Sequence, residues 1–521
     1  QEGSRKVAGR WRGGGRSEGY RRWVVWVRAR GRAAMVRAPE IALTPQLRRI
    51  FASHVGEDIA VLHASLRAGE RYDEWKRVRS GQARVVIGTR SAVFAPLRNL
   101  GLLILDEEQE STYKSENVPK YHARDVAKYR CAQNDALLVL GSATPSVESM
   151  YHARRGDYRL FTLRRRYNEQ ALPEVLIADM KQELRVGNGT SLSGPLRAGL
   201  AAAMEAGEQS ILFLNRRGAS RMVTCGEFGE VPTCPRCSVP LTYHSAHGRL
   251  TCHYCGHSEP LPDACPSCGG ALNFLGYGTQ KVEEELHAAF PGREILRMDT
   301  DTVSATQSHE KLLSRFEKER IPVLVGTQMV AKGLDFENVT LVGVSSADLS
   351  LYVDDYRAGG RTFSLLTQVV GRAGRGAKQG RAVIQTFTPE NDVIRCAARQ
   401  DYDSFYEQEI QLRRLRDEPP FRDILVLTAS GPDEAGVLRV CTRLRQFLER
   451  ELPKLPDQSF RLLGPAPAVI ARVNNRYRYR LTLVGQDSRP LRSLIAALLR
   501  AVRQDRESRG PSVFADLNPL D

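Results

Sequence analysis

The stretch LLILDEEQE, residues 102–110, decides the fold. Four apolar residues run directly into Asp106 and Glu107, which is typical of a strand buried on both faces of a parallel sheet. Ligands of open α/β sheets bind beyond the carboxyl ends of such strands. One carboxylate at that edge can hold Mg²⁺, and a second can orient or deprotonate an attacking water molecule. An isolated Asp-Glu-Glu run is more typical of a solvated turn, so the other motifs must decide.

Similar apolar runs on either side predict an α/β layout. Helical charge patterns separate DIAVLH (58–63), ARVVIGT (83–89) and ALLVLGSAT (136–144). A second α/β unit opens with SILFLNRRG (210–218), is interrupted by a cysteine cluster and then resumes. We assign the chain to a first parallel-sheet lobe (36–160), a linker (161–205), a second lobe (206–224 and 271–400), an inserted zinc-binding module (225–270) and a C-terminal α+β domain (415–521).

Composition gives weaker information. Of the 521 residues 42% are apolar and 26% charged, an ordinary globular balance that excludes a disordered chain, a collagen and a coiled-coil rod. No window approaches eighteen uncharged apolar residues, so no transmembrane helix is predicted, and no secretory signal is evident. The net charge is +16, but residues 1–38 hold eleven Lys and Arg against two Glu. A basic balance indicates nucleic acid, only weakly when it is concentrated in one segment.

That basic segment, residues 1–35, differs from the rest of the chain. It contains three of the four tryptophans and shows no sustained helical or strand period. We interpret it as a disordered basic tail or a translation artefact, in preference to a functional basic arm.

Two motifs of the second unit complement the Asp-Glu-Glu run. VGTQMVAKGLDF (325–336) is either a loop that contacts nucleotide and phosphodiester or an ordinary strand-exit loop. In QVVGRAGRG (368–376), Arg372 and Arg375 are three residues apart and would share a helical face with Gln368. Paired guanidinium groups can bind a γ-phosphate, although a solvated basic face is the alternative. Carboxylates in one lobe and arginines in the other predict a nucleotide bound between the two.

The cysteines indicate zinc. Seven of ten lie between Cys225 and Cys268, and six of these form C-x-x-C pairs, which in a chain without a signal peptide indicates metal binding in a reducing cytosol. One site is complete, with four thiolates from Cys234, Cys237, Cys252 and Cys255. A second has only Cys225, Cys265 and Cys268, and the fourth ligand could be His244, His247, His253 or His257. We predict one to two zinc ions per chain.

These motifs, taken together, resemble the superfamily-two helicases. The resemblance rests on PEIALTPQL (39–47), GTRSAVFAPL (88–97), DEEQESTYK (106–114), YHARDVA (121–127), GSATPSVES (141–149) and the two motifs of the second unit. With the cysteine cluster, the chain is similar to the primosomal replication-restart helicases, the PriA family, from about residue 36 to its C-terminus.

The resemblance implies two RecA-like lobes and an ATP- and Mg²⁺-dependent helicase that moves 3′ to 5′ on DNA. It implies recognition of stalled forks, reloading of the replicative helicase, and forked and single-stranded DNA, primosome proteins and single-strand-binding protein as partners. It also implies a cytoplasmic monomer without membrane association. By motif match, Asp106 binds metal and Glu107 activates water, Arg372 and Arg375 are arginine fingers, Gln368, Gly333 and Asp335 bind the nucleotide, and the DNA-binding residues are Thr89, Arg90, Thr327, Gln328 and Lys332.

The departures from this family are informative. It carries a phosphate loop of the type G-x-x-x-x-G-K-[ST] before PEIALTPQL, whereas the corresponding stretch here reads GRWRGGGRSEGYRRW (9–23). The family's N-terminal fork-binding domain is not found either. Gln109 stands where the family usually has His, and Phe228 stands where the second zinc site would have its fourth cysteine. We therefore predict poor ATP hydrolysis by this chain.

Three rival interpretations remain open. The first is a catalytically impaired DNA-binding scaffold of the primosome, suggested by the missing phosphate loop. The second is another superfamily-two motor, such as a restriction-enzyme subunit or a branch-migration helicase, which the zinc cluster argues against. The third, a free-standing zinc-ribbon regulator, leaves the carboxylate and arginine motifs unexplained.

The motif RVNNRYRYR (472–480) also has two interpretations. It predicts either a strand that binds single-stranded nucleic acid or a strand with a charged outer face and a core face.

Overall fold

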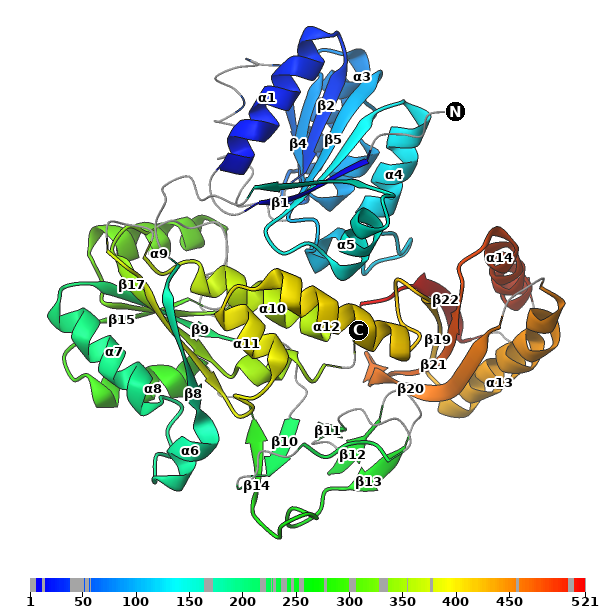
Figure 1. Ribbon diagram of the computed structural model, residues 1–521. Coiled ribbons are helices and arrows are strands. Elements are labelled where there is room, and N and C mark those ends of the chain that lie inside the picture. Colours follow the sequence, from blue (N-terminus) through cyan, green and yellow to red (C-terminus); the bar gives the residue numbers. More distant parts are fainter. Residues whose placement is uncertain are drawn as a thin grey trace. The chain divides into compact units, whose positions relative to one another are not determined.

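The computed structural model is shown in Figure 1. It forms two units, Gln1–Ala171 and Leu172–Pro519, and each is described by itself. No helix among the described residues is both long and apolar enough to cross a membrane. The structure describes residues 6–11, 15–37, 51, 56, 58–163, 172–215, 222–225, 227, 231–235, 241–244, 248–252, 257–275, 279–298, 306–327, 336–353, 355–374, 378–455, 459–504 and 510–520.

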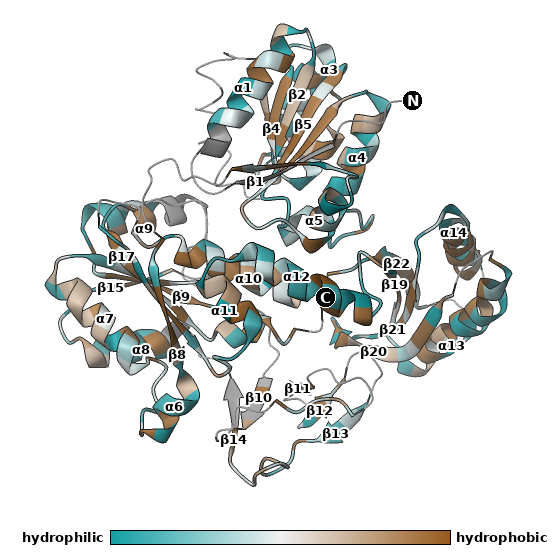
Figure 2. Cartoon of the chain, viewed as in Figure 1, coloured by the Kyte–Doolittle hydropathy of each residue, from teal (hydrophilic) through white to brown (hydrophobic). Residues whose placement is uncertain are grey.

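The first unit is built on a parallel sheet with the strand order β3-β4-β2-β5-β6-β1-β7. Its central strands are buried on both faces, and Figure 2 shows them in hydrophobic colours. The strands are β1 (Lys6–Trp11), β2 (Ala33–Arg37), β3 (Ile59–Leu62), β4 (Val85–Gly88), β5 (Leu100–Asp106), β6 (Leu137–Ser142) and β7 (Arg159–Leu163). The helices are α1 (Gly15–Ala29), α3 (Ala68–Ser80), α4 (Ala123–Gln133) and α5 (Val147–Arg154), with 3₁₀ turns at Arg90–Phe94 and Ser111–Tyr113.

The described residues of the basic N-terminal segment, 6–11 and 15–35, belong to this lobe, so the expectation of a disordered tail is wrong for them. β1 lies between β6 and β7 in the sheet, and α1 buries Tyr20, Val24 and Val27 in the core. These three residues follow a helical spacing of four and three, which the surrounding arginines obscured in the sequence. The first lobe therefore begins before residue 36.

The second unit contains a parallel sheet with the order β15-β16-β9-β17-β18-β8. Its strands are β8 (Glu174–Asp179), β9 (Gln209–Leu214), β15 (Ile295–Met298), β16 (Val323–Gly326), β17 (Val339–Ser345) and β18 (Arg381–Thr386). The helices are α6 (Met180–Arg185), α7 (Gly194–Glu205), α8 (Thr279–Ala289), α9 (Thr306–Lys318), α10 (Ala358–Val370), α11 (Asp392–Ala398) and α12 (Tyr402–Leu415), with a 3₁₀ turn at Ala347–Ser350.

The segment predicted as a linker, residues 161–205, is largely part of the two lobes. β7 ends within it and belongs to the first sheet, whereas β8 pairs with β18 of the second. α7 packs Leu196, Leu200 and Ala203 into the second core. The polar residues around 164–171, which suggested a linker, lie outside the described residues.

The cysteine-rich insertion leaves the second lobe after β9 and returns before α8. β10 (Met222–Cys225) pairs antiparallel with β14 (Leu272–Leu275). A separate antiparallel sheet is formed by β11 (Thr242–His244), β12 (Arg249–Thr251) and β13 (Ser258–Pro260). Because β9 pairs with β16 and β17, the insertion does not interrupt the second sheet.

The C-terminal domain is α+β, as predicted. Its antiparallel sheet has the order β20-β21-β19-β22, and α13 and α14 cover one face. The elements are β19 (Asp423–Gly431), α13 (Glu434–Glu451), β20 (Arg461–Val473), β21 (Arg476–Gly485), α14 (Arg489–Gln504) and β22 (Ser512–Leu517), with a 3₁₀ turn at Leu452–Lys454.

The RVNNRYRYR motif forms a hairpin in this domain. Asn474 and Asn475 have φ angles of 49° and 58°, as a tight two-residue turn requires. Tyr477 and Tyr479 of β21 pack against the domain core. The tyrosine face is thus a core face, which favours the second of the two interpretations of this motif.

Candidate nucleotide site and zinc-binding module

Asp106 and Glu107 lie at the carboxyl edge of the first sheet. β5 is buried up to Leu105, and Asp106 ends it half-buried. Glu107 has a φ of +47°, a conformation that is uncommon for a residue with a Cβ and occurs preferentially at functional sites. The following residue is held in place because the Glu108 amide donates to the Gly141 carbonyl over 3.1 Å. An oxygen donor at such an edge fits a hard divalent cation such as Mg²⁺.

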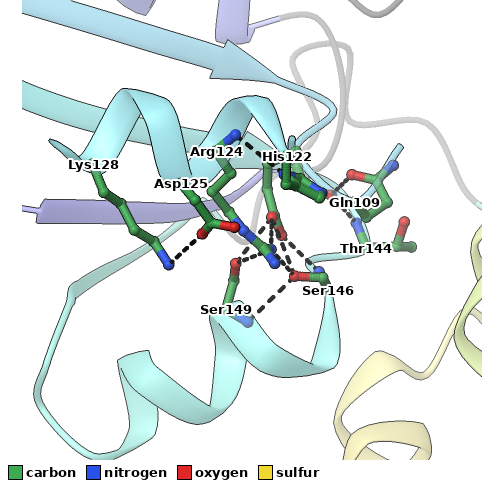
Figure 3. Close-up of polar contacts among 10 residues, drawn as sticks. Gln109, His122, Arg124, Asp125, Lys128, Thr144, Ser146 and Ser149 are labelled. Atoms are coloured by element: carbon green, nitrogen blue, oxygen red, sulfur yellow. Dashed lines mark hydrogen bonds and ion pairs between the residues drawn. The ribbon is translucent and has the colours of Figure 1, made fainter. Parts of the chain in front are cut away.

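Glu108 is buried at the centre of a polar network, and Figure 3 shows its partners Arg124, Ser146 and Ser149. Its carboxylate accepts from the Ser146 amide (2.7 Å), the Ser149 hydroxyl (2.9 Å) and the Arg124 guanidinium (2.9 Å). Burial alone would lower the pKa of Arg124, but the nearby carboxylates, Glu108 foremost, raise it above its ordinary value. The network joins the Asp-Glu-Glu run to the 141–149 loop and to α4, so three of the sequence motifs meet here.

Gln109 provides a second link between the same two loops. Its Nε2 donates to Oε2 of Glu107 (2.9 Å), and its Oε1 accepts from the Ser142 hydroxyl (2.5 Å). The Ser142 hydroxyl in turn accepts from the Thr144 amide (2.9 Å). A glutamine can make both contacts because its amide group has a donor and an acceptor. Gln109 therefore orients Glu107 relative to the GSAT loop.

Two tyrosines hold Asp106. The Tyr20 hydroxyl donates to Oδ1 of Asp106 over 2.9 Å, and the Tyr113 hydroxyl donates to the Asp106 carbonyl over 2.6 Å. Burial raises the pKa of Tyr113 well above its ordinary value, so this hydroxyl remains a donor at neutral pH. Sequence reasoning singled out neither tyrosine as a site residue, because both lie outside the acidic run.

Strand β1 and helix α1 flank the position where the family has its phosphate loop. β1 ends at Trp11, α1 begins at Gly15, and β1 lies beside β6. The sequence between them and into the helix reads GGGRS, residues 13–17. It differs from the Gly-Lys-Ser/Thr ending of a phosphate loop by an arginine at position 16. The first glycine of the G-x-x-x-x-G-K-[ST] pattern is also replaced, by Arg10, so only the ending of the motif can be recognised.

The arginine motif of the second lobe differs from its prediction. α10 includes Gln368 but ends at Val370, and Gly371 is its C-cap. Arg372 lies in the following turn, where its amide donates to the Val369 carbonyl over 3.0 Å. Gln368 and Arg372 therefore do not share one helical face. Gly371 caps the helix, and Gly374 further along the turn has a φ of +67°. Arg375 lies outside the described residues.

The predicted DNA-binding residues are only partly described. Thr89 follows β4, and its carbonyl accepts from the Arg37 guanidinium over 2.7 Å. Arg90 donates to the carbonyls of Lys114 (2.6 Å) and Thr112 (3.3 Å), so it braces the loop after Asp-Glu-Glu. Thr327 follows β16. The other predicted contacts of this loop lie outside the described residues: Gln328, Lys332, Gly333 and Asp335.

The module brings three thiols of the incomplete zinc site together. The Sγ atoms of Cys225, Cys265 and Cys268 lie within 4.8 Å of one another, and those of Cys225 and Cys268 are 3.4 Å apart. Three clustered thiols are a donor set that suits zinc. His257, a candidate fourth ligand, is instead paired with Glu259 over 2.9 Å.

The structure describes two of the four cysteines of the predicted complete zinc site. Cys234 and Cys252 are buried in a small apolar core with Val223, Leu241 and Leu250. Their knuckle partners, Cys237 and Cys255, lie outside the described residues, as do His247 and His253.

The chain has two parallel-sheet lobes, one with an acidic strand end and the other with an arginine-bearing turn, and family models assign these lobes to the helicase class. Residues 9–152 match the family model for DEAD/DEAH box helicases, and residues 271–377 match the helicase conserved C-terminal domain. Residues 234–260 match the Cys-rich region domain of PriA DNA helicase, and residues 415–520 match the primosomal protein N C-terminal domain. The first match includes the GGGRS segment.

Similar proteins give the family. The chain is 43% identical over 508 residues to the replication restart protein PriA of Bacillus subtilis, with 97% of this chain and 63% of the relative covered. It is 43% identical over 462 residues to that of Synechocystis, with 87% and 55% covered. It is 38% identical over 510 residues to that of Treponema pallidum, with 98% and 76% covered. The chain belongs to the PriA replication restart protein family. It spans less than two thirds of the first two relatives.

Proposed function

We propose that this chain is an ATP-dependent DNA helicase of the replication-restart primosome. It would move 3′ to 5′, recognise stalled forks and help to reload the replicative helicase. The carrying observation is the site at the edge of the first sheet, where Asp106 and Glu107 are linked to the 141–149 loop through Glu108 and Gln109. Forked and single-stranded DNA, primosome proteins and single-strand-binding protein are the proposed partners of a cytoplasmic monomer.

The proposed chemistry follows from the side chains. Asp106 would hold Mg²⁺, which neutralises charge on the nucleotide phosphates. Glu107, oriented by Gln109, would accept the proton of the attacking water. Arg372 and Arg375 would stabilise the charge that develops on the phosphate. Gln368, Gly333 and Asp335 would bind the nucleotide, and the loops at Thr89, Arg90, Thr327, Gln328 and Lys332 would contact DNA.

The rival function is a catalytically impaired DNA-binding scaffold, and Arg16 is the observation that favours it. A lysine at this position of a phosphate loop reaches the β- and γ-phosphates with a compact ammonium. An arginine is longer and planar, so the substitution is not conservative. We therefore expect weak ATP turnover, limited by the loop and not by the acidic site.

DNA-stimulated ATP hydrolysis of three proteins tests this. Wild type is expected to be weakly active, and Arg16→Lys more active. Glu107→Gln in the Arg16→Lys background is expected to lose roughly 10²–10⁴-fold, as the removal of a general base does. Fork binding that persists without turnover in wild type and Arg16→Lys would favour the scaffold. Turnover that Glu107→Gln leaves unchanged would overturn the proposed role of this site.

Zinc is the second part of the proposal. Cys234, Cys237, Cys252 and Cys255 would bind one ion. Cys225, Cys265 and Cys268 would bind another with three thiolates, which is supported by their distances.

A further inference from the structure

Tyr20 places a buried hydroxyl directly on the predicted metal ligand. The residue is 1% exposed, and its hydroxyl donates to Oδ1 of Asp106 over 2.9 Å. The ring is held in the first core with Val24 and Val27 of the same helix, and it lies 6.5 Å from the ring of Trp23. A ring packed in this way has little freedom to move, so the position of its hydroxyl is fixed.

Gly141 leaves the space that this hydroxyl needs. A Cβ at position 141 would lie 1.8 Å from the Tyr20 hydroxyl oxygen, 3.0 Å from its Cζ and 3.5 Å from Oδ1 of Asp106. Gly141 is paired with Asp106 across β5 and β6. Its φ is not in the left-handed region, so the backbone does not require glycine here. The absence of a side chain is explained by the approach of Tyr20.

Asp106 is thereby fixed at two points. Tyr113 holds its main-chain carbonyl, and Tyr20 holds one oxygen of its carboxylate. Carboxylates that bind metals are commonly oriented by such hydrogen bonds from residues that do not touch the ion, and removal of the donor typically lowers metal affinity 10- to 100-fold.

We infer that Tyr20 is a positioning residue for Mg²⁺-dependent nucleotide binding, and that Gly141 is the small residue that admits its hydroxyl. This inference rests on the proposed function, because it takes Asp106 as the metal ligand. Tyr20 acts through Asp106 by fixing the rotation of its carboxylate. The opposite possibility is a hydroxyl that competes with the cation for Oδ1, and it predicts the opposite change when the hydroxyl is removed.

The test is a Mg²⁺ titration of the binding of fluorescent mant-ADP to the full chain, which does not depend on turnover. Tyr20→Phe keeps the ring and removes the hydroxyl. We expect its half-saturating Mg²⁺ concentration to rise roughly tenfold, with mant-ADP binding in the absence of Mg²⁺ unchanged. Tyr129→Phe is the matched control, because the Tyr129 side chain is 64% exposed on α4. It should bind like wild type.

Gly141→Ala tests the same contact from the other side. Its Cβ would displace the Tyr20 hydroxyl, so this variant is also expected to need more Mg²⁺. In the Tyr20→Phe background the closest clash is gone, so the added alanine should have a smaller effect than in wild type. Such non-additivity is the signature of two residues that share one contact. The Gly141→Ala variant also provides a second measurement of the contact if Tyr20→Phe folds poorly.

The outcomes separate this inference from the proposed function. If wild type shows no Mg²⁺-dependent mant-ADP binding, the proposed nucleotide site fails and the role of Tyr20 falls with it. If wild type binds, and Tyr20→Phe needs the same or less Mg²⁺, only the positioning role is overturned. A purely structural role would lower the melting temperature without moving the Mg²⁺ requirement, and that result would overturn it too.

Discussion

At the scale of single residues, the buried acid of the site differs from the two acids that the sequence put forward. Asp106 and Glu107 are half-buried, whereas Glu108 is 2% exposed and accepts from Arg124, Ser146 and Ser149. The Arg124 side chain is itself 15% exposed in this ion pair. Glu108 is therefore a structural acid that holds the loop after β5 and the 141–149 loop together, and its loss would leave a largely buried cation without its partner.

Glu108→Gln is expected to destabilise the first unit strongly. Breaking a buried ion pair by removing one partner costs about 3–5 kcal/mol, because the remaining charge stays desolvated. Urea unfolding, followed by a signal from the first unit, measures the change. Glu116→Gln is the control, since Glu116 is exposed in the same region, and it should remain within about 0.5 kcal/mol of wild type. A similar stability for both variants would contradict the assigned role of Glu108.

The acidic strand end was predictable from the sequence, but the conformation of its residues was not. The apolar run up to Leu105 required a strand that ends at Asp106, and the structure has it there. The left-handed conformation of Glu107 arises from tertiary contacts, among them the bond from the Glu108 amide to Gly141. No local pattern encodes a contact between residues that are so far apart in the chain.

At the scale of elements, helix α1 shows what charge can conceal. Its buried stripe of Tyr20, Val24 and Val27 has the spacing of an amphipathic helix, but arginines that are partly or fully exposed lie between these residues. Helix α10 is shorter than predicted, because it ends at Val370 and Gly371 is its C-cap, so that Arg372 lies beyond it. In both cases the sequence contained the signal, and the error was to weigh composition or spacing above the positions of the apolar residues and glycines.

The zinc-binding module yields the prediction that belongs to this scale. Its second thiol cluster has three cysteines, and Phe228 stands three residues after Cys225, where a C-x-x-C pair would have its second thiol. Zinc held by three protein thiolates keeps an open position, whereas four thiolates close the shell. We expect between one and two zinc ions per wild-type chain, and two in Phe228→Cys, with slower release of the second ion to a chelator.

Metal analysis and chelator-release kinetics measure both quantities. Cys268→Ser should remove the more labile zinc, because it leaves only two thiols in that cluster. Cys131→Ser is the control, since Cys131 is a buried cysteine of the first unit, and it should leave the zinc content unchanged. A wild-type content near zero would refute the module as a metal site. Equal release rates in wild type and Phe228→Cys would show that the fourth thiolate does not bind.

At the scale of the whole molecule, the two units follow one another along the chain. Within the second unit, residues of the lobe and of the C-terminal domain line a common cavity. Asp355 and Tyr356 of the second lobe line it, together with Glu418, Arg480 and Pro519 of the C-terminal domain. No motif marked this cavity in the sequence, because residues distant in the chain form it. Its charged lining suggests that the stability of this junction depends on pH.

Glu418 is the group that makes this dependence testable. Burial raises its pKa from an ordinary value of 4.5 to about 7; Arg416 and Arg413 oppose that rise, and Glu409 and Asp355 add to it. Between these two pH values Glu418 is protonated in the folded chain and ionised in the unfolded chain. The unfolded state then binds fewer protons, so the free energy of unfolding falls as the pH rises through this window.

Glu418→Gln is expected to remove this part of the pH dependence, because glutamine is neutral in both states. Wild type should lose a few degrees of melting temperature between pH 5 and pH 7.5 relative to the variant, with the two proteins most alike at pH 5, where Glu418 is protonated in the folded chain. Glu317→Gln, an exposed position on α9 of the same unit, is the control and should follow wild type. If Glu418→Gln and wild type change in parallel across this range, the acid is not desolvated in the folded protein, and the cavity between the second lobe and the C-terminal domain is open to water.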